Sequence, residues 1–230
     1  MKPEEKAYKF LREDICRVRP EYEKKQVLVC PICMREISKE AFLEHGLEPI
    51  IPKVHSAMSR GRRSGYTVLC HEERKIEGDG SVSEDGCSGY KKRMYDSVAK
   101  NFLPEDGSVP TMLSIRQKIS ITIMAYLGAF QQFGYGSVFW DELDEIRKQF
   151  DFPKKKITKW IDNSVCMPMN DPFYLMGSTK DQPFAVGGSV QDGHPLHMVF
   201  GKCFTLLPVG LGELVASGIK MLNLDERMRR

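Results

Sequence analysis

Apolar positions spaced at the helical period predict that much of this chain is helical. The clearest segments are residues 4–18 and 113–133, where apolar side chains recur every three or four positions. Shorter helices are predicted at the following places: residues 39–45, 91–102, 138–150 and 154–163. Helices therefore account for most of the regular structure that the pattern predicts.

Short apolar runs predict strands in two parts of the chain. Residues 26–29 and 65–69 each lead directly into a cysteine, whereas residues 77–89 are rich in Gly, Ser and Asp and predict a loop. Farther along, three glycine-punctuated runs predict an antiparallel hairpin packed on helices: residues 184–186, 197–200 and 203–207. The whole pattern indicates an α+β protein.

Four cysteines in the first hundred residues have spacing typical of a structural zinc site. Cys30 and Cys33 form a Cys-x-x-Cys pair, whose two thiolates can turn toward one tetrahedral ion. Cys70 is a third candidate ligand, and either Cys87 or His71 is the fourth. We favour Cys87, because adjacent residues rarely reach one ion together and a longer intervening loop costs little entropy.

The zinc module suggests how the chain is divided. We expect an N-terminal helix within residues 1–25, a zinc-binding module over 26–103 and a helical C-terminal domain with short strands over 111–230. A Pro- and Gly-containing turn separates the last two.

Composition adds information about partners and location. The formal net charge of +3 over 230 residues does not by itself favour nucleic acid, but four basic residues lie close together without an acid: Lys53, Arg60, Arg62 and Arg63. The sequence shows no signal-peptide pattern and no apolar stretch long enough to span a bilayer, so we expect no membrane partner. Cysteines at knuckle spacing favour metal binding in a reducing compartment, and we expect the cytoplasm.

The segment between the cysteines resembles the HNH nuclease superfamily. Residues 48–53 read Glu-Pro-Ile-Ile-Pro-Lys and lie between the Cys-x-x-Cys pair and the sequence Thr-Val-Leu-Cys at 67–70. This order is similar to the HNH branch whose core reads Cys-x-x-Cys, Glu-His-Ile-Ile-Pro-Lys, then Cys-x-x-Cys. The resemblance covers about residues 28–96. It implies a treble-clef zinc module of HNH type, followed here by a helical region with a small antiparallel β hairpin.

The resemblance also implies roles for particular residues. In that superfamily an acidic residue helps to bind a catalytic divalent ion such as Mg²⁺ or Mn²⁺, and the adjacent histidine takes a proton from water. Glu48 matches the acidic residue, and four cysteines match the structural Zn²⁺ ligands: Cys30, Cys33, Cys70 and Cys87. Pro49 stands in the place of the histidine and cannot accept a proton. Three other histidines could replace it: His45, His55 and His71.

Three functions are consistent with these features. The first is an HNH-like nucleic-acid-binding protein of bacterial or phage type with little or no cleavage, in which the basic residues between 53 and 63 contact phosphates, with DNA as the favoured ligand. The second is an active metal-dependent endonuclease that uses His45 or His55 as its base. The third is a non-enzymatic module that binds another protein in host–phage conflict.

Overall fold

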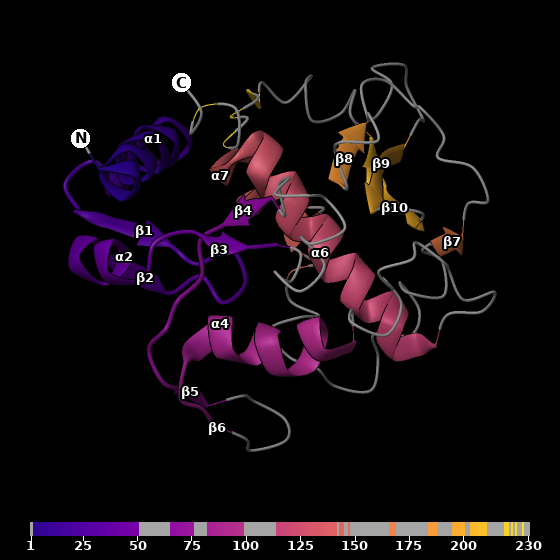
Figure 1. The fold of residues 1–230 in the computed structure, drawn as a ribbon. Helices are drawn as coiled ribbons and strands as arrows, with labels where there is room; N and C mark the ends of the chain where they lie inside the picture. Colours follow the sequence, from indigo (N-terminus) through magenta and orange to yellow (C-terminus); the bar gives the residue numbers. More distant parts are fainter. Residues whose placement is uncertain are drawn as a thin grey trace.

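The N-terminal half of the protein consists of helices and short hairpins (Figure 1). The computed structural model describes residues 2–50, 65–75, 82–98, 114–141, 143–144, 147, 166–168, 184–187, 195–200, 203–210, 219–220, 222, 224 and 227. In order, the elements are α1 (Pro3–Val18), η1 (Pro20–Tyr22), β1 (Val27–Val29), β2 (Glu36–Ser38), α2 (Lys39–His45), β3 (Glu48–Pro49), β4 (Tyr66–Thr67), β5 (Arg74–Lys75), β6 (Val82–Ser83), α4 (Gly86–Lys91) and the π-helix η3 (Lys92–Asp96).

The second half contains a long helix and a sheet. Its elements are α6 (Ile115–Phe133), α7 (Tyr135–Val138), β7 (Cys166–Pro168), β8 (Phe184–Gly187), β9 (Pro195–Phe200) and β10 (Cys203–Gly210). The last four strands form one antiparallel sheet in the order β7-β10-β9-β8, and three smaller hairpins pair β1 with β2, β3 with β4 and β5 with β6. The protein is therefore α+β, as predicted.

Helix boundaries follow from their capping residues. The N-cap Ser38 accepts a hydrogen bond from the backbone of Ala41 at the start of α2. Ser114 and Gln117 form a capping box at the start of α6. Gly134 ends α6 at a positive φ of 59°, where a side chain would meet the buried carboxylate of Asp14. The helices predicted at 4–18, 39–45 and 113–133 are confirmed.

The loop predicted at residues 77–89 is wrong at its C-terminal end. β6 lies within it, and α4 begins at Gly86, five residues before the predicted helix start. Gly86 has a φ of 56°, and a Cβ there would lie 2.5 Å from the carbonyl oxygen of Cys70. The glycine that suggested a loop therefore permits a close backbone approach at the helix start. The helix predicted at 154–163 lies outside the described residues, as do residues 142, 145–146 and 148–150 of the one predicted at 138–150.

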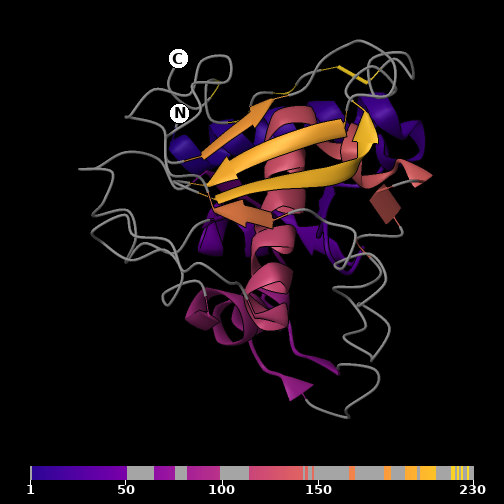
Figure 2. The same ribbon diagram turned by 90° about the vertical axis from the view of Figure 1, so that its right-hand side faces the viewer.

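Helix α6 is buried almost all the way around between two layers. One side contacts β4 and η3, and the other contacts strands of the four-stranded sheet, which crosses the helix in Figure 2. From Ser120 to Phe133 every residue except Gln132 is buried. The predicted C-terminal hairpin is confirmed as β9 and β10, and it is the centre of a larger sheet.

Among the described residues, the helices include none with the length and apolar character needed to cross a bilayer.

Candidate metal centre and the adjacent polar cluster

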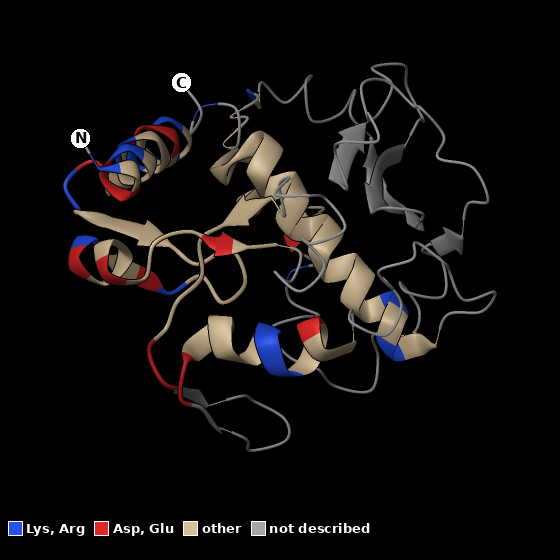
Figure 3. Ribbon diagram, in the orientation of Figure 1, with Lys and Arg blue, Asp and Glu red and all other residues tan. Residues whose placement is uncertain are grey.

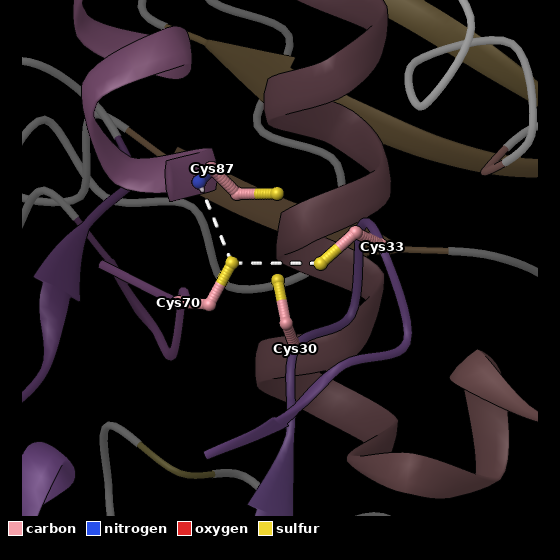
Figure 4. A group of neighbouring side chains, drawn as sticks. All are labelled: Cys30, Cys33, Cys70 and Cys87. Atoms are coloured by element: carbon pink, nitrogen blue, oxygen red, sulfur yellow. Dashed lines mark hydrogen bonds between the residues drawn. The ribbon is translucent and has the colours of Figure 1, made fainter. Parts of the chain in front are cut away.

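Four cysteine side chains converge in the N-terminal half, as Figure 4 shows. We call this group the cysteine cluster: Cys30, Cys33, Cys70 and Cys87. Their Sγ atoms all lie within 4.8 Å of one another, and the Sγ atoms of Cys33 and Cys70 are 3.4 Å apart. A tetrahedral zinc ion with Zn–S bonds of about 2.3 Å requires S···S distances of about 3.8 Å. The cluster can therefore hold a zinc ion with small adjustments.

The first cysteine pair lies in the turn between β1 and β2. Met34 has a positive φ of 63°, its N–H donates to the carbonyl of Cys30, and the N–H of Cys30 donates to the carbonyl of Arg35. This tight turn brings both thiols to one side of the hairpin. The turn depends on a non-glycine residue in the left-handed region, a conformation that costs about 1–2 kcal/mol.

The second pair comes from two segments that meet at Gly86. Cys70 follows β4, and Cys87 lies in the first turn of α4. The Ser88 N–H donates to the Cys70 carbonyl at 3.2 Å, and the Cys87 N–H points at the Cys70 Sγ at 3.5 Å. Such N–H···S contacts stabilise a thiolate, which is the form that binds metal.

Three side chains from the second half of the chain form hydrogen bonds with the backbone around the first cysteine pair. The Tyr135 hydroxyl accepts from the N–H of Val29 and donates to its carbonyl. The Tyr126 hydroxyl donates to the carbonyl of Pro31 at 2.6 Å, and the Arg147 guanidinium donates to that of Ile32 at 3.0 Å. All four bonds are buried. The turn that presents the thiols is thus fixed by α6 and its C-terminal neighbours.

The chemistry of the cluster also fits a soft cation. Burial raises the pKa of the Cys30 thiol well above its ordinary value. Hydrogen bonds from Cys30, Cys33 and Cys87 lower the pKa of Cys70. Four thiolates cannot share so small a buried volume without a compensating charge, and a bound Zn²⁺ ion would supply it.

Next to the cysteine cluster lies a polar group around Glu48. We call it the Glu48 cluster: Glu48, His71, Ser88 and Lys92. One oxygen of Glu48, Oε1, accepts from the Ser88 hydroxyl at 2.7 Å and lies 3.2 Å from His71 Nε2 and 3.3 Å from Lys92 Nζ. Burial alone would raise the pKa of this carboxyl, but bonds from His71 and Ser88 and the charge of Lys92 outweigh it and lower the pKa to about 2.

The two clusters share their backbone. Cys70 and His71 are adjacent, and so are Cys87 and Ser88, yet in each pair one side chain turns to the cysteines and the other to Glu48. A metal held by Cys70 and Cys87 would therefore also fix two of the three partners of Glu48, namely His71 and Ser88.

A buried ion pair lies on the far side of Glu48. Lys91 is 2% exposed, and its ammonium donates to Asp96 at 2.7 Å and to the carbonyl of Pro49 at 3.0 Å. The wider π-helical turn of η3 brings residues five apart into contact. This lysine joins α4 to the β3–β4 hairpin beneath the Glu48 cluster.

The structure separates the predicted site residues into three groups. The four cysteines are brought together, and His71, the other candidate for fourth ligand, contacts Glu48. His45 stacks on His71, with ring centroids 3.8 Å apart and planes 7° from parallel. The remaining candidates lie outside the described residues: Lys53, His55, Arg60, Arg62 and Arg63.

Sequence analysis did not select Ser88 or Lys92. Ser88 follows a candidate zinc ligand, and Lys92 lies one helical turn later, within the basic run Lys91-Lys92-Arg93. These positions indicate a shared site only once α4 is known to begin at Gly86.

Comparison of the chain with protein-family models, with curated proteins and with solved structures found no match.

Proposed function

We propose that this protein is an HNH-like, zinc-stabilised nucleic-acid-binding protein, of bacterial or phage type, without ordinary metal-dependent cleavage. The order of its elements supports the family resemblance. A cysteine pair in a hairpin turn is followed by the β3–β4 hairpin, and then by α4, which carries the last cysteine. That order is typical of a treble-clef zinc module, with the hairpin and helix of a ββα finger.

The contacts that the Glu48 carboxylate already makes are the observation that carries the proposal. A hard divalent ion such as Mg²⁺ needs several oxygen ligands at once. Here the Lys92 ammonium and the His71 imidazole both contact the same oxygen of Glu48, Oε1. In addition, Pro49 stands where the HNH superfamily has a histidine. Lys92 supplies the positive charge that a catalytic cation would supply, and its charge opposes binding of that cation.

Basic side chains support binding to nucleic acid. Lys92 and Arg93 are exposed just after α4, Arg116 is exposed near the start of α6, and Lys118, two residues later, is partly exposed. Figure 3 shows basic residues on both of these helical segments. The sequence-selected basic residues lie in the segment that joins β3 to β4. Positive side chains on neighbouring elements are the usual means by which a protein contacts phosphates.

A binding assay paired with a cleavage assay tests the proposal. The zinc-loaded protein should bind a labelled DNA at 50 mM salt, with affinity that falls as salt rises, and should not nick plasmid in Mg²⁺ or Mn²⁺. Changing Arg62 and Arg63 to Ala should weaken binding similarly for different sequences. Absence of binding at low salt would contradict the proposal and favour a protein partner.

One contact favours the alternative of an active metal-dependent endonuclease. His71 Nε2 lies 3.2 Å from Glu48 Oε1, and the His45 ring stacks on the His71 ring. Imidazoles are therefore present beside the carboxylate, although proline stands at position 49. Under this alternative, cleavage would be strong in the parent and lost in His45→Ala, His55→Ala or His71→Ala. Gain of nicking in Pro49→His would instead support the proposal that the scaffold persists without its base.

A further inference from the structure

A hollow of about 240 Å³ lies between η3 and the first turns of α6. Its walls include Tyr90, Arg93, Met94, Val98, Arg116 and Ile119. Pockets that enclose whole drug-sized ligands measure about 300–1,000 Å³. This hollow is smaller, so it is suited to one flat ring whose remaining parts stay outside.

Exposed apolar surface gathers at this hollow. In the described part of the chain, the large apolar side chains that are exposed are Met94 and Ile115, at 46% and 55%. Met94 lines the hollow, and Ile115 lies one helical turn before Ile119, on the same face of α6. Exposed apolar side chains that lie close together mark binding surfaces more often than isolated ones do.

The charged side chains among the described residues that line the hollow are positive. Arg93 and Arg116 line it from opposite elements. The nearest acid in η3 is Asp96, which is 8% exposed and paired with Lys91 at 2.7 Å. The ligand should therefore carry negative charge on both sides of an apolar or aromatic group.

The walls are fixed before a ligand arrives. The Ser120 hydroxyl of α6 donates to the carbonyl of Tyr95 at 2.8 Å in a buried bond. The rings of Tyr90 and Tyr95 meet edge to face, with centroids 5.7 Å apart. The separation of η3 from α6 is thus set by contacts inside the protein, which lowers the entropy cost of binding.

We propose that this hollow receives an unpaired base of a single-stranded nucleic acid, with Arg93 and Arg116 contacting the flanking phosphates. The inference deepens the proposed function, on which it rests, by naming the ligand class. A base has the size and flatness that the hollow accepts, and its two phosphates match the two guanidinium groups. A base in a duplex is stacked and paired, so it cannot enter without being extruded.

Fluorescence anisotropy on the full zinc-loaded chain tests this inference. The probes are a labelled mixed-sequence 12-mer, the same sequence as a duplex, and an acidic peptide of alternating Glu and Leu. The single strand should bind at least about five-fold more tightly than the duplex, and Met94→Glu should weaken it about five-fold or more, because the new carboxylate would repel the flanking phosphates. Arg116→Ala should lower the salt slope by about 0.7. Lys9→Ala, on the exposed face of α1, is the matched control and should change neither value.

The results separate this inference from the proposed function. If both nucleic acids bind but Met94→Glu and Arg116→Ala leave affinity unchanged, with zinc content and circular dichroism also unchanged, the hollow is not the base site, while the proposed function stands. If neither nucleic acid binds at 50 mM salt, both fail. If only the acidic peptide binds and both variants weaken it, the ligand class is wrong.

Discussion

The cysteine cluster and the Glu48 cluster use the same two backbone segments, yet they differ in the properties that decide metal binding. The cysteine cluster offers four soft donors within 4.8 Å, mostly buried and held from behind by Tyr126, Tyr135 and Arg147. The Glu48 cluster offers one carboxylate, and a lysine ammonium lies 3.3 Å from it. One site offers the donors that a soft cation needs, whereas the other already contains a positive charge.

The comparison shows how two sites with different metal preferences can be built on neighbouring residues of the same backbone segments. Each cluster takes one residue from the 70–71 pair and one from the 87–88 pair. Zinc at the first cluster would therefore keep the second in its present geometry, whether or not the second binds metal. Substitutions in or beside either cluster can test this difference.

Removing one thiol should produce the largest effect. Cys30→Ser should release the metal and unfold the N-terminal half, because structural zinc contributes about 10–16 kcal/mol in zinc-finger peptides. Bound zinc and the thermal unfolding curve measure this. Cys16→Ser is the control, because Cys16 lies on α1 outside the cluster. Retention of zinc and of the folding transition in Cys30→Ser would show that Cys30 is not a ligand.

Gly86→Ala should be the next most damaging change. Its Cβ would lie 2.5 Å and 2.8 Å from the carbonyl oxygens of Cys70 and Glu72, at a φ of 56°. We expect a loss of about 3 kcal/mol or more, since left-handed strain alone costs about 1–2 kcal/mol. Gly46→Ala should show only the strain, because its φ is 71° but a Cβ there would lie 3.6 Å from its nearest neighbour, the Glu4 side chain. Equal losses in urea unfolding would mean that the Gly86 contact is unimportant.

Support from the second half of the chain can be tested with Tyr135→Phe. The change removes one hydroxyl that serves both backbone groups of Val29, and it should cost about 1–3 kcal/mol because both groups remain buried. Tyr22→Phe is a suitable control, since Tyr22 contacts Phe139 through its ring. If Tyr135→Phe leaves the free energy of unfolding unchanged, the Tyr135 hydroxyl does not help to hold the first cysteine pair in place.

The smallest expected effect concerns Glu48 and pH. Its pKa is lowered in the folded protein from 4.5 to about 2, so its stabilising contribution is present above about pH 4.5 and is lost as pH falls toward 2. Glu48→Gln should cost about 1–2 kcal/mol at pH 7, because Gln can still accept from Ser88 but loses the attraction between the carboxylate and the Lys92 ammonium. The stability difference between parent and variant should shrink in acid. A difference that grows as pH falls below 4.5 would contradict this assignment.

Local sequence patterns predicted much of the fold. The features that they did not predict depend on contacts between residues far apart in the sequence. The helical period and the capping residues define α1, α2 and α6, and the cysteine spacing selects the four thiols that converge. The role of Tyr135 depends on contact with Val29, which is 106 residues away in sequence. The start of α4 was missed because Gly86 fits a loop equally well until its backbone contact with Cys70 is known.

Native mass spectrometry of the protein after incubation with Mn²⁺ tests the central claim most directly, because it counts both kinds of metal in one spectrum. The account predicts the mass of the chain with one zinc ion and no retained manganese, since the cysteine cluster accepts a soft cation and Lys92 opposes a hard one. A folded chain without zinc, or a chain that retains manganese lost on Glu48→Gln, would contradict it.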